Sequence, residues 1–367
     1  MKASKADTEW IRFQLFTPKD SELPIYLGGN FNDWKTTDPT FRLERKGAGY
    51  YEIKLPIKHL TFPLYYRYAR QDWNGVELDE FGNDAPERFL KNPIPEVIDK
   101  VPRWMVDGKS YPVEYLPKIE VISDAFEIPQ LGKKRRISIL LPHDYHETET
   151  RYPVLYLHDG QNLFDEAAPF GNWGVNKKLA ILKDRGHSGL IIVAIDHGGV
   201  DRIKEFTPFQ QTKWGTGDGK KYVRFLADTL KEYVDKHYRT LPDRENTGVG
   251  GSSMGGLISV YAGLMYPEVF GKLLIFSPSL WASPKIYFRA INFYNPDHTD
   301  VYVYAGGKES EYMVPNVKRF ISALEHKGLE TKEVTFKLHI EPEGIHNEAT
   351  WGAQFPKAAE WLFPSKK

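Results

Sequence analysis

Residues 248–257 read GVGGSSMGGL, and this stretch is the strongest indication of the fold in the sequence. Five glycines and two adjacent serines in ten positions suit neither a regular helix nor an ordinary strand. From Gly251 onward the stretch matches G-x-S-x-G, a sharp strand-to-helix turn that exposes a serine hydroxyl. Only Ser253 fits, because a motif centred on Ser252 would need glycine where the chain has Met254. The alternative is a glycine-rich turn without chemistry.

The sequence around this turn favours the first interpretation. Short apolar strands alternate with longer amphipathic runs, which is typical of a parallel sheet covered by helices on both faces. The expected strands are RRISILLP, YPVLYLHDG, GLIIVAIDHGG, TGVGGSS, KLLIFSPS, DVYVYAGG and VTFKLHIEP. Residues 220–238 carry apolar side chains at helical spacing and are expected to form a crossover helix. Residues 133–367 are therefore predicted to form an α/β domain.

A nucleophilic serine needs a base and, behind it, a carboxylate that orients the base. In such sheets the order along the chain is serine, acid, histidine, each on a loop after a later strand. The last expected strand leads into EGIHNEATW, so His346 is the expected base, and a surface histidine without a role is the alternative. The preceding loop offers Glu309, favoured because it lies nearer the strand end, and Glu311. Glu348 is a further alternative, and a dyad without an acid stays open.

The negative oxygen that forms during attack on a carbonyl needs two backbone N–H donors. One is expected from Met254 and the second from LHDGQN, as the N–H of Gly160 or Gln161. A metal site is the alternative for four polar residues at these strand ends: His158, Asp159, Asp196 and His197. Their spacing matches no recognised metal motif, so we expect no metal and no cofactor.

The first 115 residues have a different pattern. WIRFQLF, LPIYLGG, YYEIKLPI and LYYRYAR alternate apolar and polar positions with period two, which predicts a small antiparallel β-sandwich. Residues 116–132 are expected to form a linker with an entering edge strand.

Composition narrows the classes of partner. Lysine plus arginine and aspartate plus glutamate each total 49, so no net charge attracts nucleic acid or an anionic membrane. The absence of cysteine excludes disulfides, thiolate metal sites and cysteine nucleophiles. MKASKADTEW lacks a secretory pattern, so a cytoplasmic location is expected for the sequence as written, or a periplasmic or secreted one if a leader was removed. The oligomeric state is left open.

Five stretches together resemble the esterase D-like esterases, a family with enterobactin esterases and many feruloyl and acetyl-xylan esterases. They are YPVLYLHDGQNLFD, DRIKEFTPF, YRTLPDRENTGVGGSSMGGL, FSPSLW and GIHNEATW, within residues 133–364. The resemblance implies an α/β-hydrolase fold with Ser253 as nucleophile and His346 as base. It also suggests three residues that line or support the substrate cleft, with structural roles as the alternative: Trp173, Arg202 and Glu205.

The front region has a looser resemblance. IYLGGNFNDW and YYRYARQDWNGVELDEFGNDAPERF are similar to the early-set, Ig-like β-sandwiches of starch- and glycogen-binding modules and of enterobactin esterases. In the sugar-binding versions, exposed tryptophans stack on sugar rings, and Trp34 and Trp73 are the matching residues. The alternative is that Trp34 closes the core and Trp73 caps a hairpin.

The sequence thus predicts a serine carboxylic-ester hydrolase that works through an acyl-enzyme. The expected partner is a small-molecule or oligosaccharide ester, in the first place an acyl or feruloyl ester of a carbohydrate. An enterobactin-type siderophore trilactone is the first alternative. A non-catalytic glycan-binding protein with a hydrolase fold is the second, and the intact serine and histidine argue against it.

Overall fold

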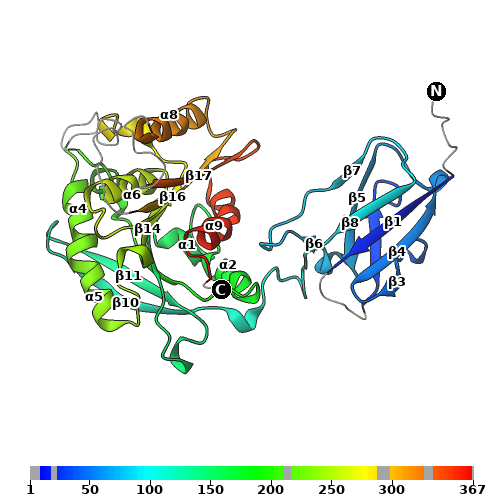
Figure 1. Cartoon of the computed structure of the whole chain (residues 1–367), viewed down its shortest axis with the longest axis horizontal. Coiled ribbons are helices and arrows are strands. Elements are labelled where there is room, and N and C mark those ends of the chain that lie inside the picture. The colour runs from blue at the N-terminus through cyan, green and yellow to red at the C-terminus, as the bar shows by residue number, and fades with distance from the viewer. Residues whose placement is uncertain (1–8, 18–22, 210–215, 287–297, 326–333, 366–367) are drawn as a thin grey trace. The chain divides into compact units, whose positions relative to one another are not determined.

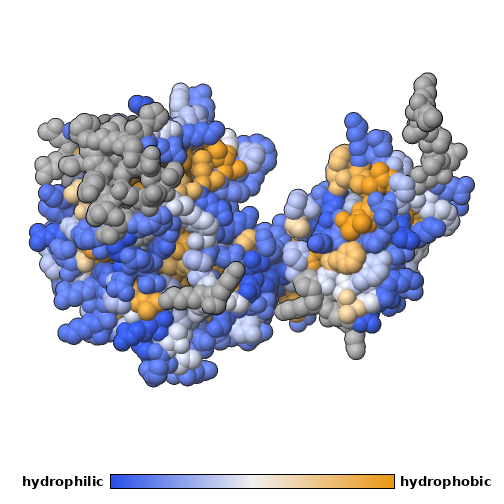
Figure 2. Space-filling model, viewed as in Figure 1, coloured by the Kyte–Doolittle hydropathy of each residue, from blue (hydrophilic) through white to orange (hydrophobic). Residues whose placement is uncertain are grey.

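The computed structural model describes residues 9–17, 23–209, 216–286, 298–325 and 334–365. The chain divides into two compact units, Met1–Pro112 and Val113–Lys367 (Figure 1). Hydrophilic residues cover most of the visible surface that the structure describes (Figure 2). Within that part of the chain, no helix has the length and apolar character needed to cross a membrane.

The second unit is built on an eight-stranded sheet with the order β10-β11-β13-β12-β14-β15-β16-β17. The strands are β10 (Lys118–Ile128), β11 (Lys133–Leu141), β12 (Val154–His158), β13 (Ile191–Ile195), β14 (Thr247–Ser252), β15 (Lys272–Phe276), β16 (Thr299–Gly306) and β17 (Val334–Glu341). All seven predicted strands are present. The sheet is mixed rather than parallel, because β11 runs antiparallel to both β10 and β13.

The segment 116–132, expected to be a linker with an entering edge strand, contains that strand. Most of it forms β10, which pairs with β11 from Lys118 opposite Leu141 to Ile128 opposite Lys133. β10 is an edge strand with largely exposed or half-buried side chains, so it lacks the apolar run that marks the inner strands. The division between the units falls a few residues earlier, after Pro112.

Helices cover both faces of this sheet (Figure 1). On one face lie α2 (Val175–Asp184) and α9 (Glu348–Leu362), and on the other α4 (Gly219–Phe225), α5 (Lys231–His237), α6 (Met254–Met265) and α8 (Met313–Glu325). The predicted crossover helix is formed by α4 and α5, joined by a π-helical turn over Leu226–Leu230. Two short helices, α1 (Gln161–Phe164) and α3 (Arg202–Glu205), follow β12 and β13.

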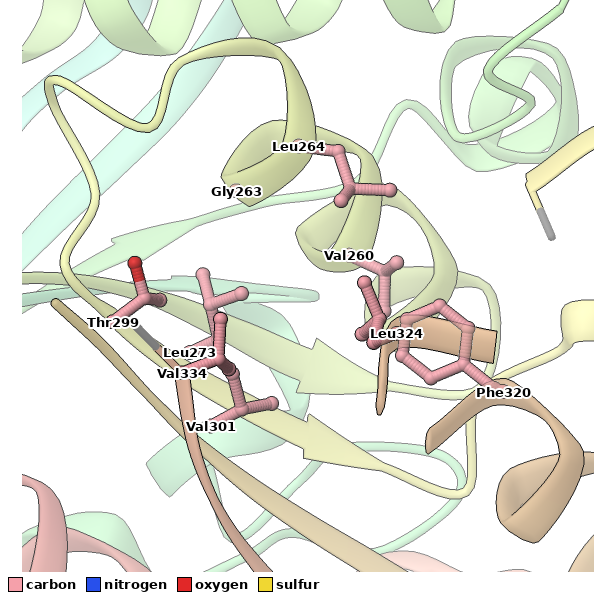
Figure 3. A pocket seen from close by; sticks show the side chains of 9 residues that line it. All are labelled: Val260, Gly263, Leu264, Leu273, Thr299, Val301, Phe320, Leu324 and Val334. Carbon is pink, nitrogen blue, oxygen red and sulfur yellow. The ribbon is translucent and has the colours of Figure 1, made fainter. Parts of the chain in front are cut away.

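A small apolar pocket lies between α6, α8 and the first residues of β15, β16 and β17 (Figure 3). Its lining residues are Val260, Gly263, Leu264, Leu273, Thr299, Val301, Phe320, Leu324 and Val334. The pocket lies at the amino ends of the strands, whereas Ser253 follows the carboxyl end of β14. It therefore belongs to helix–sheet packing rather than to the expected site.

The first unit contains two larger sheets, β3-β4-β1-β8 and β2-β5-β7, and a strand pair, β6-β9. The strands are β1 (Trp10–Phe16), β2 (Ile25–Gly29), β3 (Glu44–Gly47), β4 (Tyr50–Pro56), β5 (Leu64–Arg70), β6 (Glu77–Leu78), β7 (Arg88–Leu90), β8 (Glu96–Lys100) and β9 (Arg103–Trp104). The larger sheets share one core, in which Phe13 of β1 meets Tyr66 of β5 edge-to-face at 5.4 Å. The unit is not wholly antiparallel as expected, because β1 and β8 run parallel.

Candidate active site

Ser253 occupies a strained turn between β14 and α6. Its backbone angles are φ 57° and ψ −119°, which a residue with a side chain rarely adopts. The neighbouring glycines permit this turn, since a Cβ on Gly251 would lie 3.1 Å from the backbone of Gly255. The serine side chain is held at the carboxyl edge of the sheet, where it is partly exposed.

His346 and Glu309 form an acid–base pair on the loops after β17 and β16. Nδ1 of His346 lies 2.7 Å from Oε2 of Glu309. The other carboxylate oxygen accepts hydrogen bonds from the Gly306 N–H (2.7 Å) and from the Ser277 hydroxyl (2.6 Å). With both oxygens accepting, Glu309 holds the proton of a neutral His346 on Nδ1 and leaves Nε2 as a proton acceptor.

The two alternative acids occupy other positions. The side chain of Glu311 is exposed, while that of Glu309 is 1% exposed. Glu348 accepts a hydrogen bond from Nδ2 of Asn162 at 3.2 Å. The structure therefore brings Glu309, rather than Glu311 or Glu348, to the imidazole.

Two residues that sequence reasoning did not single out complete a ring of contacts around this pair. The indole N–H of Trp351 donates to the Ser277 hydroxyl at 2.9 Å, and the Trp351 ring meets His346 edge-to-face at 4.8 Å. Ser277 is fully buried and has a φ of 44°, a further strained position. Ser277 lies in FSPSLW and Trp351 in GIHNEATW, two stretches that carried the family resemblance. The stretches did not by themselves indicate a role for either residue.

The segment after β15 connects this ring to the serine. The Ser279 N–H donates to the Ser253 carbonyl at 2.9 Å, and the two hydroxyls lie 3.2 Å apart. Among the residues that the structure describes, the Ser253 hydroxyl thus bonds Ser279 and not His346. Bonds between nucleophile and base are often long in a ligand-free protein and tighten with substrate.

Of the two candidates for the second oxyanion donor, the Gln161 N–H is the one retained, because the Gly160 N–H has another partner. The Gly160 N–H already donates to the Ile195 carbonyl at 2.9 Å. Gly160 is needed instead for close packing, since a Cβ there would lie 2.6 Å from Oδ1 of Asp196. Gln161 and Met254 each begin a helix, where the first N–H groups have no partner within the helix.

The side chain of Gln161 is fixed by the next loop. Its amide nitrogen donates to the His197 carbonyl at 3.2 Å, and its amide oxygen accepts from the His197 N–H at 3.0 Å. These two bonds to the backbone of one residue hold the Gln161 side chain against the loop after β13.

The sequence of this chain is similar to that of known esterases. A family model described as "Putative esterase" matches residues 128–362, well over half of the chain. The chain belongs to this esterase family. The sequence resemblance to esterases is thereby confirmed.

Three similar proteins illustrate the range of the family. "Uncharacterized protein YbbA" of Bacillus subtilis is 25% identical over 243 residues, 62% of this esterase and 92% of that protein. "Endo-1,4-beta-xylanase/feruloyl esterase" of Xylanibacter ruminicola is 25% identical over 246 residues, 63% of this chain but 30% of that protein. The solved structure of the enterobactin esterase FES from Shigella flexneri is 16% identical with a TM-score of 0.51, covering 96% of this chain and 92% of that one. At this identity the structural likeness shows the fold.

Arg202 begins the short helix α3 and is paired with Asp159. Its Nε and a terminal nitrogen contact the two carboxylate oxygens at 2.5 and 2.8 Å. Asp159 itself has a φ of 57° and precedes Gly160. The charge of Arg202 is thus balanced by a carboxylate in a two-point contact.

Trp173 and Glu205, expected to line or support the cleft or to have structural roles, are buried. Trp173 is 4% exposed and stacks on Phe276 with ring centres 5.3 Å apart. Glu205 is fully buried and accepts hydrogen bonds from Lys133 (3.0 Å) and Arg135 (2.7 Å). Both residues support the cleft from within the core.

The residues considered as metal ligands have other partners. Nδ1 of His158 lies 3.0 Å from the Tyr222 hydroxyl, and Asp159 is paired with Arg202. In the described ranges no three histidine, aspartate or glutamate side chains are grouped to hold a metal ion. Burial lowers the pKa of His158 from 6.5 to about 4, so this histidine is neutral in the folded protein near neutral pH.

Acid should therefore destabilise the fold through His158. Between pH 6.5 and 4 the unfolded chain binds a proton that the folded chain does not, so stability is full above 6.5 and falls as the pH drops. This one group should lower the free energy of unfolding by about 3 kcal/mol between pH 7 and pH 4. Urea unfolding at both pH values should show a smaller difference for His158→Gln than for wild type. His146→Gln, at an exposed site, should retain the wild-type difference, and an equal reduction in both variants would contradict the assignment.

Proposed function

We propose that this esterase hydrolyses carboxylic esters through an acyl-enzyme on Ser253. The observation that carries the proposal is the 2.7 Å contact between His346 and a Glu309 carboxylate whose other oxygen is held by two donors. Such a pair presents a neutral imidazole whose free nitrogen takes a proton from a hydroxyl.

The reaction proceeds in two halves. The Ser253 oxygen attacks the ester carbonyl carbon as Nε2 of His346 takes its proton, and the N–H groups of Met254 and Gln161 bind the negative oxygen. Glu309 stabilises the imidazolium, which then protonates the departing alcohol. A water molecule, deprotonated by His346, attacks the acyl-enzyme, releases the acid and restores the serine.

The substrate we propose is an acyl or feruloyl ester of a carbohydrate. A relative carries feruloyl esterase in its name, and the first unit has a pair of surface tryptophans that suit sugar rings. The rings of Trp34 and Trp73 lie 6.2 Å apart at 49°, and the indole N–H of Trp73 donates to the Trp34 carbonyl at 3.0 Å. Trp73 is 37% exposed and Trp34 half-buried, and neither belongs to the core of the unit.

Loss of the exposed ring should weaken glycan binding. Trp73→Ala removes a stacking surface worth about 1 kcal/mol, so affinity for an oligosaccharide should fall about fivefold. Calorimetric titration with oligosaccharides derived from starch, glycogen and xylan measures the affinity. Trp10→Ala, which removes a 43% exposed tryptophan from β1, should bind like wild type. A wild-type protein that is not retained on any of the three polymers would remove the sugar-binding role.

A siderophore trilactone is the second candidate substrate. The observation in its favour is that the match to the enterobactin esterase fold extends over 96% of this chain and so includes both units. The two candidates require different alcohols at the same serine.

A substrate panel tests the proposed function. Wild type and Ser253→Ala would be compared on nitrophenyl acetate, methyl ferulate, acetylated xylan and a catecholate trilactone. Serine-dependent turnover of the ferulate or xylan ester supports the first candidate, and turnover of the trilactone alone supports the second. A wild type inactive on all four that still binds glycans would favour the non-catalytic alternative.

A further inference from the structure

Glu348 lies between the base and the oxyanion helix and has no role in the steps above. It begins α9, two residues after His346, and its carboxylate accepts the hydrogen bond from Asn162, which follows Gln161. A Cβ on Gly171 would lie 4.0 Å from that of Glu348, so the loop after α1 also packs here. Glu348 thus joins the two loops that define the reaction centre.

The charge of this half-buried carboxylate is only partly balanced among the described residues. Glu348 accepts from the Asn162 amide, and the nearby cation is Arg202, which is paired with Asp159 and also interacts with the charge of Glu348. One guanidinium therefore serves two carboxylates. Burial raises the pKa of Glu348 and the charge of Asp159 raises it further, while His346 lowers it. Each of these effects requires the groups to be close in a poorly screened environment.

Arg202 offsets only part of this charge for an incoming ligand. Its guanidinium is occupied by the two oxygens of Asp159, so the pair presents little net charge. The described residues near the serine therefore leave an excess of negative charge at Glu348.

Three large apolar side chains are exposed on the loops that carry these residues. Phe170 is 75% exposed beside Gly171, Ile345 is 48% exposed beside His346, and Trp281 is 53% exposed on the segment that contacts Ser253. Exposed apolar side chains on loops at one edge of a sheet are typical of a binding surface. They favour a ligand with an apolar group rather than a highly charged one.

We propose that Glu348 is a specificity-determining residue that makes the site select uncharged esters carrying an apolar group and reject anionic ones. This inference rests on the proposed function. Within it, an uncharged acyl or feruloyl ester is favoured over a polyanionic siderophore complex. A like charge within several ångströms of a half-buried carboxylate should lower kcat/KM about tenfold.

A matched pair of esters tests this inference. 4-Nitrophenyl butyrate and 4-nitrophenyl hemisuccinate share a leaving group and an acyl length and differ in one carboxylate. At pH 8 and low ionic strength, wild type should prefer the butyrate at least tenfold in kcat/KM beyond the ratio of their uncatalysed rates. In Glu348→Gln, whose amide oxygen still accepts from Asn162, this preference should fall five- to tenfold.

The control is Glu343→Gln, which removes an exposed carboxylate paired with Lys308 on the same loop and should keep the wild-type ratio. Serine-dependent turnover with the same ratio in wild type and Glu348→Gln would overturn the inference while the proposed function stands. Turnover that survives Ser253→Ala, or no turnover of either ester, would overturn the proposed function and this inference with it.

Discussion

Replacing Ser253 by alanine is expected to lower kcat for a short-chain nitrophenyl ester about a millionfold, to the level set by binding and the oxyanion donors alone. The loss follows because, in the proposed reaction, the acyl group is bonded to the Ser253 oxygen, which alanine lacks. The melting temperature should stay close to that of wild type, since alanine keeps the same backbone strain and loses one hydroxyl contact, with Ser279.

Ser252→Ala is the matched control for that experiment. Ser252 precedes the nucleophile, is 6% exposed and belongs to β14, so its removal should change kcat less than about threefold. A large loss in Ser252→Ala with full activity in Ser253→Ala would place the nucleophile one residue earlier and invalidate the proposed elbow.

Replacing Glu309 by glutamine is expected to lower kcat about ten-thousandfold. The Ser277 hydroxyl and the Gly306 N–H both point at one oxygen of Glu309, so a glutamine there places its amide oxygen toward them and its NH2 toward Nδ1 of His346. Nδ1 must then accept a hydrogen bond, the proton moves to Nε2, and the imidazole no longer takes a proton from Ser253. Single-turnover kinetics with a nitrophenyl ester measure the loss directly.

Glu311→Gln tests the same loop without touching the imidazole. Its side chain is exposed two residues further on, and kcat should remain within about twofold of wild type. If Glu311→Gln lost as much activity as Glu309→Gln, the contact between Glu309 and His346 would not be the one that serves the reaction.

Local patterns in the sequence were sufficient to predict much of the fold. The inner strands of the sheet are short apolar runs, and the elbow has a glycine pattern that few other structures require, so both were predicted with the correct order. The edge strand within residues 116–132 was predicted without bounds, because an edge strand with one solvated face carries no such run. The parallel pairing of β1 with β8 depends on a connection of about 80 residues, which local alternation does not encode.

Residue type and order along the chain were sufficient to predict the pair of His346 and Glu309. His346 and Glu309 follow the carboxyl ends of strands that the sheet brings together, and the structure places them in contact. The positions of three other predicted residues depend on the packing of the whole fold, which the sequence does not show. Trp173 and Glu205 are buried in the core, and the Gly160 N–H donates to the Ile195 carbonyl. Ser277 was overlooked because its importance lies in one hydrogen bond to Glu309.

The ring formed by His346, Glu309, Ser277 and Trp351 draws its members from the ends of β15, β16 and β17 and from α9. The proposed nucleophile and oxyanion donors, by contrast, come from earlier in the chain. A polypeptide folded only through α6 would therefore possess the serine turn but lack a competent base. During synthesis or refolding, turnover should thus return with the slowest structural probe, which makes esterase activity a reporter of the completed fold rather than of its first core.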